Sequence, residues 1–352
     1  MPSTSSVILR RLAFIPATLL VLAIGYSLLW LYGAHRLEEG FKDWARFQSA
    51  HGTTVAYGAL AASGYPGFVR LTITAPHVTS AKSGWQWSAA RADLETRAWN
   101  WKTYRVDVLG TQQIGVPFDG AVEHLTARSA ATFVIAKINS RGRVSQAAFQ
   151  THGLRLSDAA GTDILSATTV RGTTQTPAVK AIAHDQTSLD VTLQADNVLL
   201  GPVMATPLGK KVERIALAAT IKGALPGSLA RDAVDAWRRG GGTIDLDHFT
   251  LNWGALDLRA NGTMALDDRL RPLGAVSAEI SGYGETLGAL EQARVLPHKT
   301  VEGSRFALDL LSRRDESDGR RVVTVPLSAQ NGSLYLGPLR IVRLAAIPFP
   351  AR

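Results

Sequence analysis

An uncharged apolar run from Leu12 to Tyr32 restricts this chain more than any other feature of its sequence. A helix rises about 1.5 Å per residue, so a run of this length covers the roughly 30 Å hydrocarbon core of a bilayer. Arg10 and Arg11 precede the run, and Trp30 lies near its far end, where aromatic rings anchor helices at the membrane interface. The pattern predicts a single-pass anchor, with residues 1–34 forming a cytoplasmic tip and the membrane segment and the rest exported.

Two other interpretations of the apolar run stay open. A cleaved signal peptide has a shorter apolar core, of about 7 to 15 residues, and ends in small residues, whereas this run ends Trp-Leu-Tyr. The buried helix of a soluble protein rarely carries apolar residues on every face. An uncleaved anchor is therefore the prediction.

Residues 35–52 are expected to form a juxtamembrane amphipathic helix. Leu37, Phe41, Trp44 and Phe47 recur at helical spacing among charged side chains. We expect this apolar face to pack on the domain that follows, and contact with a partner or a lipid surface is the alternative.

The hydrophobic period changes after Gly52 from 3.6 residues to two, as in strands that bury one face. Residues 69–74 show the alternation clearly, and it recurs to the end of the chain. The sequence predicts a mainly β fold, a long twisted antiparallel sheet or meander. We divide it into an N-terminal β-rich half, residues 53–200, and a C-terminal β-rich half, residues 201–352.

Two or three helices are expected to cover this sheet. One is predicted near residues 228–239, with Ser228 as its N-cap, and another near residues 285–295. The pairs Asn261-Gly262 and Asn331-Gly332 each predict a hairpin, because both central positions of a type I′ turn require positive φ.

Composition and motifs argue against an enzyme. The chain has no cysteine, and its eight histidines show neither a His-x-x-x-His nor a His-Glu-x-x-His spacing. The formal net charge of +9 is spread along the chain and accompanies no nucleic-acid-binding motif. We therefore expect no catalytic residue, no metal site, no cofactor and no nucleic-acid partner.

The apolar face of the predicted sheet is the candidate binding site. Two short helices are too small to cover a sheet of this length, so part of the face should curl into a groove for acyl chains. Each buried methylene would contribute about 0.8 kcal/mol. The alternative is a sheet that closes on itself and fills its interior with side chains. The residues expected on this face are Val69, Leu71, Ile73, Ile244, Leu246, Leu256, Leu258, Leu334 and Leu336.

Three stretches, residues 64–68, 252–267 and 325–338, carry a resemblance to a known family. Together with the N-terminal anchor, they make nearly the whole chain similar to the proteobacterial family catalogued as domain of unknown function 2125. A helix followed by a long β-meander is also similar in architecture to the AsmA-like proteins, which handle envelope lipids. The motif residues have a structural rather than catalytic character, and they are Gly64, Tyr65, Pro66, Trp253, Gly254, Asn331, Gly332, Gly337 and Pro338.

The resemblance implies a place in the bacterial inner membrane, and the flanking charges imply a cytoplasmic N-terminus with the bulk of the chain periplasmic. The expected function is to bind or pass lipid or another apolar envelope ligand, with the bilayer as the first partner. The alternative is a non-enzymatic scaffold or assembly factor that binds another envelope protein. A contiguous apolar concavity would favour lipid binding, and a flat apolar patch near the membrane helix would favour the scaffold.

Overall fold

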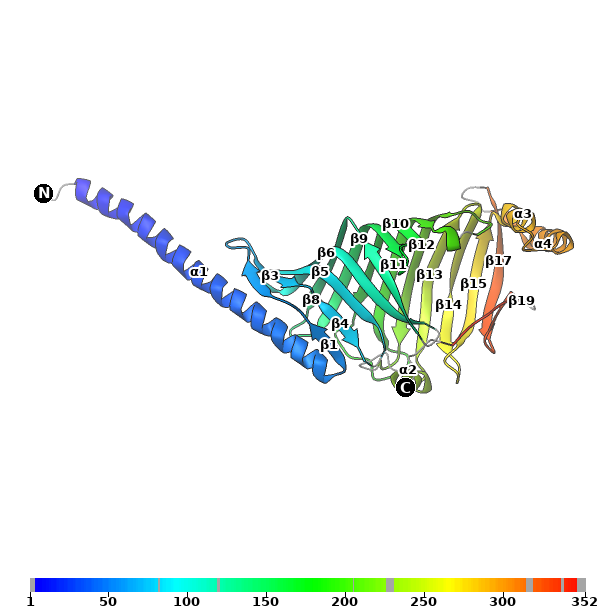
Figure 1. Ribbon diagram of the computed structural model, residues 1–352, viewed down its shortest axis with the longest axis horizontal. Coiled ribbons are helices and arrows are strands. Elements are labelled where there is room, and N and C mark those ends of the chain that lie inside the picture. Colours follow the sequence, from blue (N-terminus) through cyan, green and yellow to red (C-terminus); the bar gives the residue numbers. More distant parts are fainter. Residues whose placement is uncertain are drawn as a thin grey trace.

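The computed structural model describes residues 4–81, 83–118, 121–204, 206–225, 231–314, 319–336 and 339–346. Over these residues the chain forms a long N-terminal helix, α1 (Thr4–Ala50), followed by one antiparallel sheet of nineteen strands with small helices at its margins (Figure 1). The mainly β, antiparallel fold expected from the alternating pattern is confirmed.

The strands of the first half, as far as residue 200, are β1 (Thr53–Ala56), β2 (Leu60–Ser63), β3 (Val69–Thr74), β4 (His77–Ser80), β5 (Gln86–Arg97), β6 (Asn100–Phe118), β7 (Ala121–Arg128), β8 (Ala131–Ile138), β9 (Val144–Ser157), β10 (Asp163–Gln175) and β11 (Thr187–Leu200). Those that follow are β12 (Lys211–Lys222), β13 (Thr243–Trp253), β14 (Leu256–Leu266), β15 (Pro272–Ser281), β16 (Arg313–Arg314), β17 (Arg321–Gln330), β18 (Ser333–Leu336) and β19 (Leu339–Arg343).

Strand order follows the chain with few exceptions. At the α1 end β3 and β4 both pair with β5, and β6 pairs with β5, β7 and β8. From β8 to β15 each strand pairs with the next, and β15 then pairs with β17, which leads to β18 and β19. Consecutive strands joined by short connections therefore make a meander, as the sequence predicts.

The expected boundary between the two halves, at residues 200 and 201, lies between strands β11 and β12, and these two strands pair with each other. The β11–β12 pairing runs from Thr187↔Lys222 to Leu199↔Lys211, and a short 3₁₀ turn, Pro202–Met204, lies in the connection. Gly201 and Pro202 thus belong to a hairpin connection within one sheet.

The N-terminal helix α1 runs without interruption from the apolar run into the amphipathic segment. It contacts β1, β2 and β3 along its second half. Within the described residues, its stretch Thr18–Ala50 is long and apolar enough to cross a membrane, and a signal sequence meets the same criterion.

Within the described part of the chain, three further helices lie at the margins of the sheet. They are α2 (Arg231–Arg239), close to the helix expected near residues 228–239, α3 (Tyr283–Gln292), close to the one expected near 285–295, and α4 (His298–Leu311). The expected cap Ser228 lies outside the described residues. Sequence patterning does not predict α4, since only Val301 is buried and Leu308 partly buried, while Phe306, Leu310 and Leu311 are exposed.

The predicted hairpin at Asn261-Gly262 is wrong, whereas the one at Asn331-Gly332 is present. Strand β14 passes straight through Gly262 and pairs with β15 there. A Cβ at this position would lie 2.3 Å from the carbonyl oxygen of Ala275 on β15. That glycine permits a close approach of two backbones instead of a turn. Asn331 and Gly332 have φ of 51° and 69° and connect β17 to β18.

Candidate functional site

Cross-strand register places one row of apolar residues on a single face of the sheet. Directly paired residues of antiparallel strands point to the same side, so the face can be followed from one pair to the next. From the α1 end the row is Leu71, Leu94, Val106, Val134, Phe149, Gly172, Leu193, Leu217, Phe249, Ala260, Ala278 and Val325. An apolar face therefore extends without a break across twelve strands.

All nine residues expected on the ligand face lie on this one face. Val69 and Ile73 lie two residues before and after Leu71 on β3 and therefore on its face. Ile244 and Leu246 lie on the same face despite a register shift before Phe249. Leu256 and Leu258 follow on β14, and Leu334 and Leu336 pair with Ala329 and Leu327 on β17.

The opposite face is polar and carries ion pairs between strands. Arg70 of β3 pairs with Glu95 of β5, and Lys222 Nζ lies 2.7 Å from Asp245 Oδ2 between β12 and β13. Burial raises the pKa of Asp93, but hydrogen bonds from Arg91 and Thr72 and the charge of Arg91 outweigh burial and hold this pKa below its ordinary value. Exposed pairs add little stability, about 0–1 kcal/mol each. They do mark which side of the sheet faces water.

At the N-terminal end of the sheet, α1 covers the apolar face. Trp30, Ala34 and Leu37 pack on Val69 and Leu71, both fully buried, and on Ile73, which is 5% exposed. These three strand residues are consequently core residues and not an open surface.

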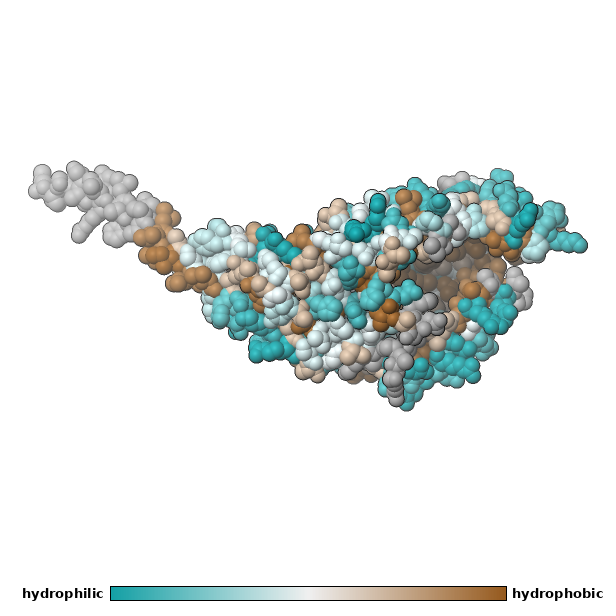
Figure 2. Space-filling model, viewed as in Figure 1, coloured by the Kyte–Doolittle hydropathy of each residue, from teal (hydrophilic) through white to brown (hydrophobic). Residues whose placement is uncertain are grey.

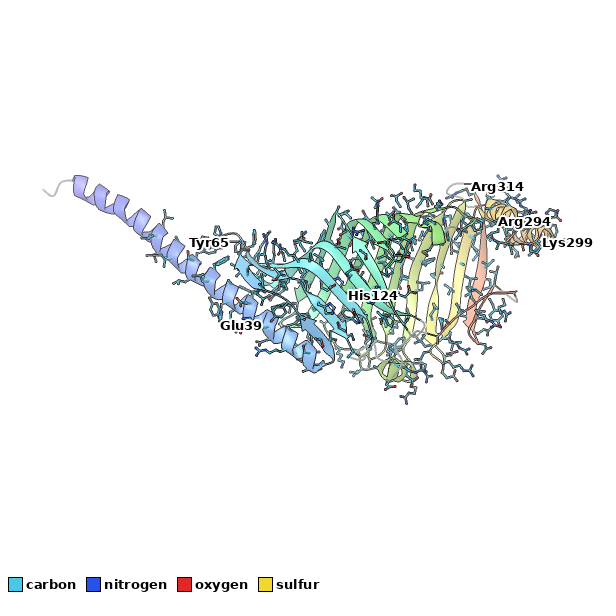
Figure 3. All side chains as sticks on the ribbon, in the orientation of Figure 1. Glu39, Tyr65, His124, Arg294, Lys299 and Arg314 are labelled. Carbon is cyan, nitrogen blue, oxygen red and sulfur yellow. The ribbon has the colours of Figure 1, made fainter. Side chains whose placement is uncertain are left out.

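The first family motif attaches α1 to the sheet. Gly64, Tyr65 and Pro66 form the connection between β2 and β3, and the Tyr65 ring lies edge-on to Trp30 with 5.6 Å between centroids. The indole N–H of Trp30 donates to the carbonyl oxygen of Phe68 at 2.8 Å. Figure 3 shows Tyr65 beside α1.

The other motif residues lie at strand ends. Trp253 ends β13 and donates from its indole N–H to the carbonyl oxygen of Gly209 at 3.0 Å, and Gly254 turns the chain with φ +59°. Asn331 and Gly332 form the turn described above, while Gly337 and Pro338 lie outside the described residues.

Between its two ends the apolar face is partly exposed over the described residues, apart from a buried cluster that includes Ala167, Val198 and Val212. Phe149 and Leu193 are 38% and 39% exposed, and Leu217 and Phe249 are half-buried. We call the surface formed by Phe149, Leu193, Leu217 and Phe249 the central apolar face. Figure 2 shows the molecule hollowed toward the strands β13–β17 that continue this face, with a hydrophobic interior and hydrophilic rims.

The described helices leave the central apolar face open. Trp237 of α2 donates its indole N–H to the carbonyl oxygen of Lys222, at the end of β12. Tyr283 of α3 and Leu308 of α4 pack at the far end, against a cluster that includes Val323 and takes in Leu258 and Leu336. None of the described strands β1–β5 pairs with β17–β19, so the described sheet does not close on itself.

A cavity of about 820 Å³ lies between α1 and the first strands. Leu29, Phe41 and Trp44 line it from the helix, while Leu94 and Val106 line it from the sheet. Arg36 is the one charged residue among its described lining residues. The cavity thus occupies the α1 end of the same apolar face.

Sequence reasoning did not select the four residues of the central apolar face. Of the cavity lining it selected Ile73 for the ligand face, and it expected Leu37, Phe41 and Trp44 to pack on the following domain. The strands of both regions show the same alternation, but alternation does not reveal which strands a helix will cover. Within the described residues, no three His, Asp or Glu side chains gather as metal ligands would.

A single antiparallel sheet with one apolar face, open at its centre and joined to an apolar N-terminal helix, defines the structural class of this protein. The family described as "Uncharacterized protein conserved in bacteria (DUF2125)" matches residues 30–345, and the chain belongs to it. This confirms the resemblance carried by the sequence motifs. No curated protein matches the chain.

Proposed function

We propose that this protein is a non-enzymatic, membrane-anchored envelope protein that binds or passes lipid acyl chains along its central apolar face. The observation that supports the proposal is the unbroken apolar row across twelve strands, partly exposed at its centre. Exposed apolar patches of this kind on soluble domains mark binding surfaces.

The dimensions of the row suit acyl chains. Eleven steps between neighbouring strands, at about 4.8 Å each, give a path of about 50 Å, longer than the roughly 30 Å core of a bilayer. Each methylene buried on this path contributes about 0.8 kcal/mol and needs no polar partner. A row that accepts chains anywhere along its length suits passage as well as storage.

The exposure of α1 supports the anchor. Leu19, Leu20, Val21 and Leu22 are each at least 60% exposed, which is favourable in lipid and unfavourable in water. With Arg10 and Arg11 before the run, we propose a cytoplasmic N-terminus and a periplasmic sheet, in the bacterial inner membrane.

A second candidate function, a scaffold for another envelope protein, is favoured by a different observation. Phe306, Leu310 and Leu311 on α4 are 75%, 77% and 65% exposed, at the end of the sheet opposite α1. Arg294, Lys299 and Arg314 lie at this same end (Figure 3). An apolar surface with a polar rim is typical of protein interfaces.

Two adjacent residues on opposite faces of β11 test lipid binding. We expect the full chain, purified from native membranes, to carry lipid detectable by mass spectrometry, and Leu193→Glu to lose it. Thr192→Glu is the matched control, because Thr192 is exposed on the polar face of the same strand. Absence of lipid from the wild-type protein, or equal loss in both variants, would overturn the proposal, and a protein that co-purifies through α4 would favour the scaffold.

A further inference from the structure

We propose that the cavity beneath α1 is the port through which the acyl chain of an anionic phospholipid leaves the membrane for the central apolar face, with Arg36 binding the phosphate. This inference rests on the proposed function, because it requires α1 to span the membrane and the central face to hold lipid.

The position of the cavity along α1 places it across the membrane surface. Its helix lining runs from Leu29 to Trp44, a rise of about 22 Å along the helix. Leu29 belongs to the apolar run that ends at Tyr32, whereas Trp44 lies about 18 Å beyond that end for a helix along the membrane normal. A lipid chain in one leaflet, about 15 Å deep in a core of roughly 30 Å, can therefore fit along this cavity.

The depth of Arg36 matches that of lipid phosphates. It lies four residues beyond Tyr32, which is about 6 Å along the helix. The headgroup layer is about 5–7 Å thick on each side of the hydrocarbon core. A guanidinium at the rim of an apolar cavity is thereby held where phosphate groups lie.

The charge of Arg36 is available to a ligand. On the same helix, Lys42 pairs with Glu38 and Glu39, and Arg46 pairs with Asp43. Arg36 is exposed and makes no ion pair or side-chain hydrogen bond with the described residues. Arginine binds phosphate by charge-assisted hydrogen bonds, often two in parallel.

The cavity is continuous with the central apolar face. Val106, which lines it, pairs with Val134 on β8, and Val134 pairs with Phe149 on β9. Ala136, also in the lining, pairs with Ala147 of β9. An acyl chain can pass from the cavity to Phe149 along apolar side chains and need not cross the polar face.

Filling the cavity tests the port. Gly40 lines it, and a Cβ there meets no atom within 4 Å, so Gly40→Phe would occupy the cavity without a backbone clash. Gly303→Phe on α4 is the matched control, since Gly303 is also helical and has equally open surroundings. Replacing glycine within a helix does not weaken the helix, so neither variant is expected to unfold.

The measurement uses the full chain in vesicles of phosphatidylcholine containing labelled phosphatidylglycerol, with a photo-crosslinking residue in place of Phe249. We expect crosslinking to labelled lipid in the otherwise unchanged chain and in Gly303→Phe, and a several-fold loss in Gly40→Phe. Normal crosslinking in Gly40→Phe would overturn the port and leave the proposed function standing. No crosslinking in the otherwise unchanged chain would overturn the proposed function and the port with it.

Arg36 is tested by headgroup preference. We expect Arg36→Gln to reduce crosslinking of phosphatidylglycerol relative to labelled phosphatidylcholine, whereas Arg46→Gln, which removes a paired arginine outside the cavity lining, keeps the preference. An unchanged preference in Arg36→Gln would overturn the role of Arg36 in binding the phosphate.

Discussion

The α1 end of the apolar face and its centre share one pattern of alternating residues but differ in burial. Leu71 on β3 is fully buried beneath α1, whereas Leu193 on β11 is 39% exposed, although a chain of direct strand pairs connects them on one face. The difference lies in what packs on the strand. A core and a binding surface can therefore share one sequence pattern, and the presence of a covering element separates them.

The largest expected contrast is in stability. Leu71→Ala should lower the free energy of unfolding by about 2–5 kcal/mol, because a fully buried leucine leaves a cavity when truncated. Leu193→Ala should change it by about 0.5 kcal/mol or less, as is usual for an exposed site. Denaturant unfolding of the full chain in detergent, followed by tryptophan fluorescence, measures both. Equal losses would mean that the centre is an ordinary core.

A smaller effect is expected where α1 is attached. Trp30→Phe keeps an aromatic ring but removes the hydrogen bond to the Phe68 carbonyl oxygen, a loss of about 1 kcal/mol. Faster hydrogen exchange should follow in β2 and β3 and not in β11. Trp44→Phe is the control, since Trp44 is 45% exposed. Faster exchange in β11 as well would contradict the separation between a covered end and an open centre.

The smallest expected effect concerns pH and should be the same in both regions. Burial raises the pKa of Asp196 on β11, but hydrogen bonds from Gln194 and Arg214 outweigh it, so this pKa, like that of Asp93 on β5, lies below its ordinary value. A lowered folded-state pKa stabilises the protein above the ordinary value near 3.8, and this stability is lost as pH falls through the lower, folded-state pKa.

Acid unfolding of Asp93→Asn and Asp196→Asn measures this effect. Each variant should lose some stability at neutral pH and show a weaker pH dependence below about pH 4. A much larger change for Asp93 would show that the two regions also differ on their polar face.

Much of the candidate site follows from local pattern. Alternation places Leu71 and Leu258 on one face because side chains repeat every two residues along a strand, and direct pairing preserves the face across strands. The Asn331-Gly332 turn follows from positive φ at both positions. Gly262 shows the limit of such reasoning, because glycine serves both turns and close backbone approaches and only the neighbouring strand decides between them.

The sequence by itself determined a long apolar helix, a mainly β chain and an apolar face, because these depend on hydrophobicity and period within a few neighbouring residues. Only the tertiary structure decided that α1 covers Val69 and Leu71, that the face stays open at Leu193, and that a cavity with Arg36 at its rim remains beneath the helix. Those features depend on where one helix ends and packs among the nineteen described strands, which is a matter of contacts between residues far apart in the chain.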